Sequence, residues 1–293
     1  MLCACIDIGT NTTRVLVADA GAGGLTEVFQ ERAFTQIGRA LAHDGRLEPA
    51  AIAAVADVVA AQRGRAQEHG AVAVRVVATA AIRGCANRDE LAAAVRERAG
   101  LAVDVLDGED EARLAFSGAL ATMGERPAGT VAVVDVGGGS SEIAVGDASE
   151  GVRWWTSIAV GSGSLGAAHA YADPPTEADI AALRTLAAAP FAAVECPQTE
   201  VALAVGGSAT SLRVLVGPQL TSRTLERALA VLRGAPAAAV AAERGLHPER
   251  VRLLPAGILV LEAVARALDQ PLWIGCGGLR EGVVLALARG LSD

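Results

Sequence analysis

The sequence predicts an α/β protein of two domains, each a mixed sheet flanked by helices. Its 293 residues are 52% hydrophobic, which allows a large core and favours two domains over one. Strand-like stretches alternate with Ala-rich amphipathic stretches, and two similar strand–turn–strand stretches indicate an internal duplication. We expect a first domain over 1–124 and a second over 125–293. The C-terminal helix, about 279–293, is a candidate for completing the first domain.

Each half begins with strands and continues into helices. In the first half, CACIDIGTNTTRVLVADA predicts a strand hairpin and LTEVFQERAFTQIG a third strand. A helix over about 49–69, the strand AVRVVAT, a helix over 88–99, the strand AVDVL and a helix from about 109 follow. After a break at 124–129, VAVVDVGGGSSEIAV predicts a second hairpin and RWWTSIAV its third strand. TEVALAVGGSATSL then predicts a strand, a glycine turn and a helix, and PAGILVLEAVARAL predicts a buried helix.

Both hairpins carry an acid and a glycine-containing polar turn, Asp7–Thr10 in one and Asp135–Ser141 in the other. Three glycines followed by hydroxyls expose several backbone N–H groups together, which is how proteins cradle phosphate. A glycine-rich hairpin without a ligand explains the second stretch equally well. Two facing domains that hold phosphates between such tips resemble the actin-like (ribonuclease H-like) ATPase fold. This resemblance implies an active site in the interdomain cleft.

Composition excludes several classes of protein. The net charge is −8, so we expect no nucleic-acid partner. The chain contains Arg but no Lys, so an anion site has no ammonium group available. No apolar run is long enough for a membrane span, and five scattered cysteines suit a reducing compartment, so we expect a cytoplasmic protein. Adjacent strand residues face opposite ways, so Trp154 and Trp155 place one ring in the core and one outside it, which points to a homodimer.

Two further stretches carry chemistry. In VATAAIRGCANRDEL, Arg83 and Asn87 lie in a loop ahead of a helix, where a guanidinium and an amide can hold phosphate. The alternative is a solvated helix entry with Asn87 as its N-cap. In LDGEDEARLAF, three acids begin a helix, and complementing the helix dipole accounts for two of them.

Together with DIGTNTTR, DVGGGSSE, AVGGSATSL and GGLREGV, these stretches resemble the exopolyphosphatase and guanosine pentaphosphate phosphohydrolase family in its short two-domain form. The resemblance implies Mg²⁺-dependent hydrolysis of a terminal phosphoanhydride, from inorganic polyphosphate or guanosine pentaphosphate, with K⁺ as an additional candidate ion. It assigns Glu111 as the catalytic base, with Asp135 and Glu142 as further catalytic candidates. Asp7, Glu111 and Asp135 are the expected metal-associated acids.

The resemblance also implies a set of phosphate-binding residues. Backbone N–H groups, hydroxyls, amides and guanidinium groups would together hold the phosphate chain. The set comprises Thr10, Asn11, Thr12, Arg14, Arg83, Asn87, Gly137, Gly138, Gly139, Ser140, Ser141, Gly207, Ser208 and Thr210.

Five positions depart from the family pattern. Gln36 and Ser164 stand where relatives carry Arg, and Cys276 and Gly277 replace an Asp and an Arg ahead of GLREG. Arg252 stands where an acid is common. Each lost charge-assisted hydrogen bond is worth roughly 1.5–3 kcal/mol, so these departures favour a looser site or a changed substrate.

Two other functions fit parts of the sequence. An actin-fold small-molecule kinase explains both hairpins and the glycine turn, but leaves GEDEARL and AAIRGCAN without a role. A polyphosphate or alarmone sensor with weak turnover explains the departures. A filament-forming relative is least favoured, because the family-specific loops would then have no role.

Overall fold

The computed structural model describes residues 1–21, 24–41, 44–125 and 127–291. The chain forms two compact units. Unit 1 comprises Met1–Thr122 together with the segment from Gly277 onward, and unit 2 comprises Met123–Cys276. Residues 292 and 293, which end the predicted C-terminal helix, and residue 126 in the predicted break lie outside the described residues. The units meet between Thr122 and Met123, just before the predicted break, and the last helix belongs to unit 1.

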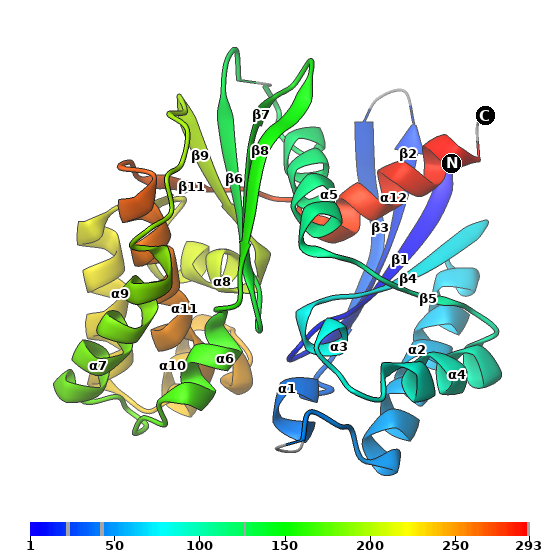
Figure 1. Ribbon diagram of the computed structural model, residues 1–293, viewed down its shortest axis with the longest axis horizontal. Coiled ribbons are helices and arrows are strands. Elements are labelled where there is room, and N and C mark those ends of the chain that lie inside the picture. Colours follow the sequence, from blue (N-terminus) through cyan, green and yellow to red (C-terminus); the bar gives the residue numbers. More distant parts are fainter. Residues whose placement is uncertain (22–23, 42–43, 126, 292–293) are drawn as a thin grey trace. The chain divides into compact units, whose positions relative to one another are not determined.

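Unit 1 is built on a five-stranded sheet in the order β3-β2-β1-β4-β5 (Figure 1). Its strands are β1 (Leu2–Ile8), β2 (Thr13–Gly21), β3 (Gly24–Ala33), β4 (Ala73–Ala78) and β5 (Val103–Val105). The first three are antiparallel, whereas β4 pairs parallel to β1 and β5 parallel to β4. The sheet is therefore mixed, as the pattern of one hairpin followed by strand–helix alternation predicts.

Helices cover both faces of the unit 1 sheet. Alternate residues of β1 face opposite ways, so each face of the strand packs against different helices. Ala4, Ile6 and Ile8 pack in the cluster that includes α2 and α4, and Cys3 and Cys5 pack against the C-terminal helix. The helices are α1 (Ile37–Ala40), α2 (Pro49–Glu68), α3 (Ala80–Arg83), α4 (Arg88–Ala99), α5 (Gly108–Ala121) and α12 (Leu279–Gly290). Asp7 follows the parity of Cys3 and Cys5, so it lies on the face covered by α12.

Unit 2 contains a six-stranded mixed sheet in the order β10-β11-β9-β6-β7-β8. Its strands are β6 (Val131–Val136), β7 (Ser141–Asp147), β8 (Gly151–Ile158), β9 (Val201–Val205), β10 (Gln219–Leu220) and β11 (Leu272–Ile274). β6, β7 and β8 are antiparallel, and β9 is parallel to β6. In this arrangement β6, β7, β8 and β9 correspond to β1, β2, β3 and β4 of unit 1.

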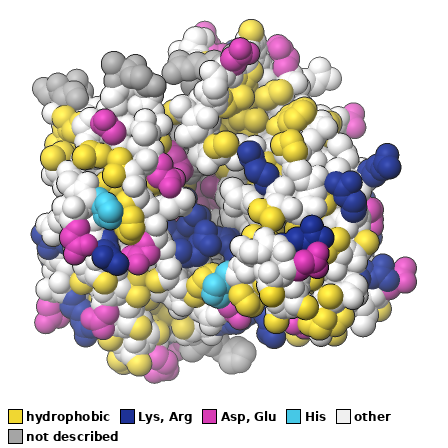
Figure 2. Space-filling model, turned by 180° about the vertical axis from the view of Figure 1, so that it is seen from behind, with side chains coloured by type: hydrophobic (Ala, Val, Ile, Leu, Met, Phe, Trp, Pro, Cys, Tyr) yellow, Lys and Arg dark blue, Asp and Glu magenta, His cyan; other side chains and the backbone are white. Residues whose placement is uncertain are grey.

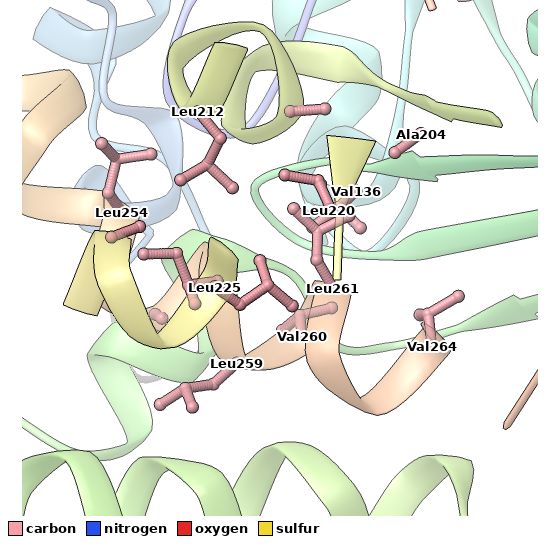
Figure 3. Close-up of a cluster of buried hydrophobic side chains, with 14 of the residues drawn as sticks. Val136, Ala204, Leu212, Leu220, Leu225, Leu254, Leu259, Val260, Leu261 and Val264 are labelled. Carbon is pink, nitrogen blue, oxygen red and sulfur yellow. The ribbon is translucent and has the colours of Figure 1, made fainter. Parts of the chain in front are cut away.

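The helices of unit 2 bury one face of its sheet in a single core. They are α6 (Ser162–Ala168), α7 (Glu177–Ala188), α8 (Gly206–Val216), α9 (Ser222–Gly234), α10 (Ala237–Arg244) and α11 (Pro248–Ala267), with a 3-10 turn, η1 (Ala189–Phe191). Figure 3 shows Val136 and Ala204 of the sheet packed with Leu212 of α8 and Leu261 of α11. Asp135 has the opposite parity to Val136, so it lies on the other face of the sheet.

Charged side chains of both signs are interspersed on the face of the molecule that Figure 2 shows. Within the described ranges, no helix combines the length and the apolar composition that a membrane crossing requires.

Candidate functional site

The β1–β2 turn of unit 1 holds its carbonyl groups inward. The Gly9 amide donates to the Thr12 carbonyl at 3.0 Å and closes the turn. The Gln36 amide donates to the Asn11 carbonyl at 3.1 Å, and the Gly38 amide donates to the Thr10 carbonyl at 2.8 Å. Among the described residues, the amides of Thr10, Asn11 and Thr12 have no backbone acceptor. The turn thus presents three successive N–H groups, a concavity suited to an anion.

The β6–β7 turn of unit 2 repeats this construction. The Gly137 amide donates to the Ser140 carbonyl at 3.0 Å. The start of α6 then binds the turn carbonyls, with Ser162 N donating to Gly137 O at 3.0 Å and Gly163 N to Gly138 O at 2.8 Å. The amides of Gly138, Gly139 and Ser140 have no backbone acceptor in the part of the chain that the structure describes. The three glycines and Ser140 of the predicted phosphate cradle therefore share one turn.

Glycine is required at the contact between α6 and this turn. A Cβ on Gly161 would lie 2.6 Å from the Gly137 carbonyl oxygen, closer than a carbon atom can approach rigid backbone. Gly38 has the matching position in unit 1, where a Cβ would lie 2.5 Å from the Thr10 side chain. Close approach of a following segment thus holds each turn.

The two hairpin acids have opposite cross-strand neighbours. Asp7 on β1 pairs directly with Arg14 on β2, whereas Asp135 on β6 pairs directly with Glu142 on β7. Glu142 is only 1% exposed and accepts a hydrogen bond from the Ser157 hydroxyl at 2.8 Å. Like charges directly opposite each other disfavour a sheet, so this pair is not explained by cross-strand attraction.

The Asp7 carboxylate has a buried oxygen atom, Oδ1, that lacks a hydrogen-bond donor among the described residues. Burial raises the pKa of Asp7 from 3.8 to about 6, while the positive charges of Arg280 and Arg14 act against that rise. An ionised Asp7 therefore favours a further positive or hydrogen-bonding ligand at Oδ1.

Asp135 lies against the start of α8. Gly206 has a φ of +84°, and a Cβ at this position would collide with the Asp135 carboxylate and approach the Val136 carbonyl to 3.2 Å. Glycine at 206 thus permits both the left-handed backbone and the close approach. The predicted glycine turn is the first turn of α8 itself, which begins at Gly206.

Arg83 and Glu111, the two residues of the family-specific stretches, form an ion pair. Arg83 ends α3, and its Nη1 lies 3.0 Å from Oε2 of Glu111 and 2.7 Å from the Leu106 carbonyl. The Glu111 side chain is 8% exposed and that of Arg83 is 28% exposed. Asp107 caps α5 by accepting from the Asp110 amide at 2.9 Å, which explains one acid of the stretch. Glu111, the predicted base, is thus the buried acid in the first turn of α5.

The Asn87 side chain makes a different set of hydrogen bonds. Its Oδ1 accepts from the Leu47 amide at 2.8 Å, and its Nδ2 donates to the Leu47 carbonyl at 3.0 Å and to Glu90 at 3.1 Å. It occupies the N-cap position of α4, but its side chain makes no capping bond. Neither the phosphate ligand nor the N-cap role accounts for these contacts, which join α4 to the segment before α2.

The predicted hydroxyl donors divide into two groups. Ser141 donates to the Val160 carbonyl at 2.6 Å, and Thr210 donates within α8 to the Gly206 carbonyl at 3.0 Å. Their protons are thus engaged inside unit 2. Ser140 in the β6–β7 turn and Ser208 in the first turn of α8 are buried, at 4% and 5% exposure.

Arg250, which no sequence motif indicates, lies near the predicted phosphate-binding residues of α8. The Arg250 guanidinium, from the first turn of α11, fills the space where a side chain on Gly207 would lie. It therefore brings a positive charge to the first turn of α8. Only its position shortly before PAGILVLEAV could have indicated it, because the contact joins positions 43 residues apart.

Three of the departures from the family pattern have structural roles. Ser164 Oγ accepts from the Gly161 amide at 2.8 Å and caps α6. A Cβ on Gly277 would lie 2.6 Å from the Thr122 side chain and 2.7 Å from the Gly118 carbonyl, so this position is closed to side chains. Arg252 lies 3.7 Å from Asp173 and accepts the Tyr171 hydroxyl at its carbonyl. Cys276 is exposed, and Gln36 has a left-handed φ of 48°.

No group of three or more His, Cys, Asp or Glu side chains is placed to hold a metal within the described ranges. The predicted metal-associated acids are Asp7, Glu111 and Asp135, and carboxylate oxygens are the ligands that a hard cation prefers. Such a cation takes one or two carboxylates and completes its shell with water and phosphate oxygens. The buried, unsatisfied Oδ1 of Asp7 is compatible with such a cation.

The chain is similar over most of its length to known phosphatases. A model of the Ppx/GppA phosphatase family matches residues 16–290. Exopolyphosphatase 2 of Mycobacterium tuberculosis is 31% identical over 317 residues, covering 97% of this chain and 98% of that protein. The guanosine-5'-triphosphate,3'-diphosphate pyrophosphatase of Aeromonas salmonicida is 27% identical, and the match covers 100% of this chain but 60% of that protein.

Solved structures confirm the predicted fold. The Aquifex aeolicus PPX-GPPA enzyme aligns with a TM-score of 0.79 at 27% identity, over 98% of this chain and 99% of that one. The two mixed sheets flanked by helices therefore have the actin-like arrangement that the hairpins predict. With the family model matching nearly the whole sequence, this chain belongs to the Ppx/GppA phosphatase family.

Proposed function

We propose that this protein is an exopolyphosphatase that hydrolyses the terminal phosphoanhydride of inorganic polyphosphate, with guanosine pentaphosphate as a second substrate. The observation that carries the proposal is the Arg83–Glu111 pair, at 3.0 Å, in which a guanidinium suited to phosphate adjoins a carboxylate suited to orient water. A kinase of the same fold needs the hairpins but has no use for this pair. The near-complete overlap with exopolyphosphatase 2 supports polyphosphate as the main substrate.

In the proposed reaction, the turn amides of Gly138, Gly139 and Ser140 are the candidate donors to phosphate oxygens in unit 2, and the amides of Thr10 to Thr12 are the equivalent candidates in unit 1. Arg83 binds a phosphate oxygen and exchanges part of its contact with Glu111 for it. Glu111 orients the attacking water toward the terminal phosphorus and takes its proton late in the reaction. The P–O bond to the leaving phosphate chain breaks as the bond from water forms.

We propose Mg²⁺ as the cofactor, with Asp7, Asp135 and Glu111 as the candidate ligand residues and K⁺ as an additional ion. When bound, Mg²⁺ neutralises charge on the phosphate oxygens. The residues fit this role because Asp7 Oδ1 is buried without a hydrogen-bond donor among the described residues and because Asp135 lies beside a second carboxylate, Glu142. A polyanion next to these acids needs compensating positive charge, so metal dependence is expected to be near absolute.

We propose that the protein is a homodimer. β8 lies at the edge of the unit 2 sheet and carries Trp154, which packs against the core, and Trp155, which has the opposite parity. The expected second copy covers this strand. Sedimentation equilibrium of the wild type and of Trp155→Ser tests the proposal; a wild-type monomer at micromolar concentration would contradict it.

We propose the cytoplasm as the working compartment. All five cysteines are free thiols, and three of them are buried in unit 1. Free thiols persist in a reducing compartment. Cell fractionation of the producing organism checks the proposal, and recovery of the protein outside the cytoplasmic fraction would contradict it.

The decisive experiment measures phosphate release with Mg²⁺ from polyphosphates of several lengths and from guanosine pentaphosphate. We expect release by the wild type and at least a roughly 100-fold loss in Glu111→Gln, because general-base catalysis contributes about that much. Glu109→Gln is the matched control: Glu109 belongs to the same helical turn but pairs outward with Arg113 at 2.8 Å. Its activity is expected to stay within about twofold, since an exposed i,i+4 pair contributes little.

The other outcomes separate the alternatives. Tight polyphosphate binding without phosphate release by the wild type would overturn the enzyme and indicate a sensor. Phosphorylation of a small molecule from ATP would instead indicate a kinase. A Glu111→Gln variant as active as the wild type would remove Glu111 from the mechanism.

A further inference from the structure

The two hairpin turns that carry the candidate phosphate-binding amides are each followed by a buried hydroxyl residue in the same position. Ile8 pairs with Thr13 across the β1–β2 hairpin, and Val136 pairs with Ser141 across the β6–β7 hairpin. Thr13 and Ser141 are therefore equivalent, each being the first residue of its second strand. Both residues have 0% exposure. Because a buried hydroxyl requires a hydrogen-bond partner, its partner indicates what the position does.

Each hydroxyl contacts the segment that follows the third strand of its unit. In unit 1, Oγ1 of Thr13 lies at hydrogen-bond distance, 3.0 Å, from Oγ1 of Thr35. In unit 2, Oγ of Ser141 donates to the Val160 carbonyl at 2.6 Å. Thr35 and Val160 each stand two residues beyond the third-strand residue that pairs with the hydroxyl residue. The same contact therefore occurs in both units, with a hydroxyl partner in one and a carbonyl in the other.

The segment that receives this contact also holds a carbonyl of the turn. In unit 1 the Gly38 amide donates to the Thr10 carbonyl at 2.8 Å, and in unit 2 the Gly163 amide donates to the Gly138 carbonyl at 2.8 Å. The two donors are equivalent, since each stands three residues beyond the residue that the buried hydroxyl contacts. The two acceptors are also equivalent, because each stands two residues beyond the paired end of the first strand. With carbonyls engaged inside the protein, the turn amides are available to an anion.

Thr13 is itself held in place from α2. The Gln62 side chain is 2% exposed, and its Nε2 donates to the Thr13 carbonyl at 3.1 Å. Its Oε1 is buried without a donor among the described residues. The other buried residues of α2 are apolar, namely Ile52, Val55, Ala56, Val59 and Ala66. An amide on this apolar face thus has one hydrogen bond to offset its burial, and that bond fixes the backbone of the residue that bears the hydroxyl.

We propose that Thr13 and Ser141 are positioning residues for the two phosphate-binding turns. In each unit the buried hydroxyl holds the segment after the third strand, and that segment holds a turn carbonyl inside the protein, which keeps the turn amides in place for phosphate. Ser141 therefore acts through the turn and not as a ligand of the substrate. The kinetic consequence rests on the proposed hydrolase function, whereas the structural content, a segment held by one hydroxyl, is independent of activity.

Two substitutions of Thr13 separate positioning from stability in steady-state phosphate release. Thr13→Val keeps the side-chain volume and removes the hydroxyl, whereas Thr13→Ser keeps the hydroxyl and removes a buried methyl group. We expect Thr13→Val to raise the KM for polyphosphate about tenfold with kcat within about threefold of wild type, because a displaced binding group weakens ground state and transition state alike. We expect Thr13→Ser to lower the Tm by about 2–4 °C with KM within about twofold of wild type.

The same test applies to unit 2 and decides the proposal if Thr13→Val does not fold. Ser141→Ala is expected to raise the KM for polyphosphate by about tenfold, again with little change in kcat. Thr185→Val is the control, since the exposed Thr185 hydroxyl donates within α7 to the Ala181 carbonyl at 3.1 Å. A KM that follows the Tm equally in Thr13→Val and Thr13→Ser would overturn positioning and leave only a packing role.

Amide hydrogen exchange without substrate or Mg²⁺ gives a second readout, which does not depend on activity. We expect the Gly38 amide to exchange at least about tenfold faster in Thr13→Val than in wild type, because its bond to the Thr10 carbonyl opens more often. The Gly163 amide is the internal control in that variant, and the two amides exchange roles in Ser141→Ala. Unchanged exchange at Gly38 in a folded Thr13→Val protein, or at Gly163 in Ser141→Ala, would overturn the structural role.

The two proposals fail in different ways. If the wild type releases no phosphate from any phosphoanhydride, the proposed function fails, and hydrogen exchange still decides whether the hydroxyl groups hold the segments. If the wild type is active but the hydroxyl-deleted variants show neither faster exchange nor a raised KM, only the positioning role of Thr13 and Ser141 is lost.

Discussion

The Arg83 guanidinium bridges the Glu111 carboxylate, at 3.0 Å, and the Leu106 carbonyl, at 2.7 Å. One side chain thus connects the end of α3 to the β5–α5 connection and to the first turn of α5. The contact brings the cation of AAIRGCAN to the carboxylate of GEDEAR. The two stretches that separate this family from other members of the fold are therefore parts of one structure.

Removing the Arg83 guanidinium is expected to lower kcat/KM for polyphosphate by about 10- to 100-fold, because a charge-assisted hydrogen bond contributes roughly 1.5–3 kcal/mol. Arg83→Met tests this in steady-state phosphate release, and Arg83→Lys is expected to recover only part of the loss. Arg88→Met is the control, since Arg88 is exposed and its Nη1 only approaches the Arg83 carbonyl, at 3.4 Å. Equal effects at Arg83 and Arg88 would contradict a specific role.

Asn87→Ala is expected to reduce stability and leave substrate binding intact. Loss of the amide leaves the N–H and C=O of buried Leu47 unsatisfied, at a cost of roughly 1–3 kcal/mol each. The expected fall in Tm is about 5 °C or more, measured by thermal unfolding, with the KM for polyphosphate within about twofold of wild type. A tenfold rise in KM with an unchanged Tm would instead support the predicted role of Asn87 as a phosphate ligand.

Gly161→Ala is expected to disrupt the β6–β7 turn, because its Cβ would lie 2.6 Å from the Gly137 carbonyl oxygen. We expect activity to fall by at least about tenfold, since small displacements of a binding group cost that much. Gly64→Ala is the matched control: a Cβ there meets nothing within 4 Å, and alanine in a helix is favoured over glycine by about 1 kcal/mol. Its Tm should rise slightly while its activity stays unchanged, whereas a normally active Gly161→Ala would show that the turn tolerates displacement.

The pKa of Asp7 predicts a distinctive pH dependence of stability. Because the folded-state pKa is raised from 3.8 to about 6, the folded protein loses stability as pH rises from about 4 through 6, by about 3 kcal/mol in total. Asp7→Asn removes this loss, so without Mg²⁺ its Tm advantage should be near zero at pH 4 and largest at pH 7. Thermal unfolding across this range measures it. A difference between the two proteins that does not vary with pH would contradict the raised pKa.

Much of the fold follows from local sequence patterns. The helix predicted over 88–99 coincides with α4, and the strand hairpins and the helix from about 109 have counterparts in β1–β2, β6–β7 and α5. These elements are set by alternation of apolar residues, glycine turns and capping residues such as Asp107, all of which act within a few positions. The short helices α1 and α3 lack such signals, and tertiary contacts define them.

The candidate site was less accessible to sequence reasoning, because its contacts join distant segments. Nothing local indicates that Asn87 bonds to Leu47, that Arg83 pairs with Glu111, or that Arg250 fills the space over Gly207. The resemblance named Asn87, Arg83 and Glu111 without their partners. Their assigned roles in binding and catalysis stay predictions.

The placement of α12 in unit 1 has a consequence for the order of events on the ribosome. The first 122 residues emerge before unit 2, but the helix that covers the Cys3, Cys5 and Asp7 face of their sheet is translated only after residue 276. Unit 2 is continuous and can fold as soon as it emerges. The first unit to be synthesised is thus the last to close, since one face of its sheet lacks its covering helix until the end of that helix has been translated.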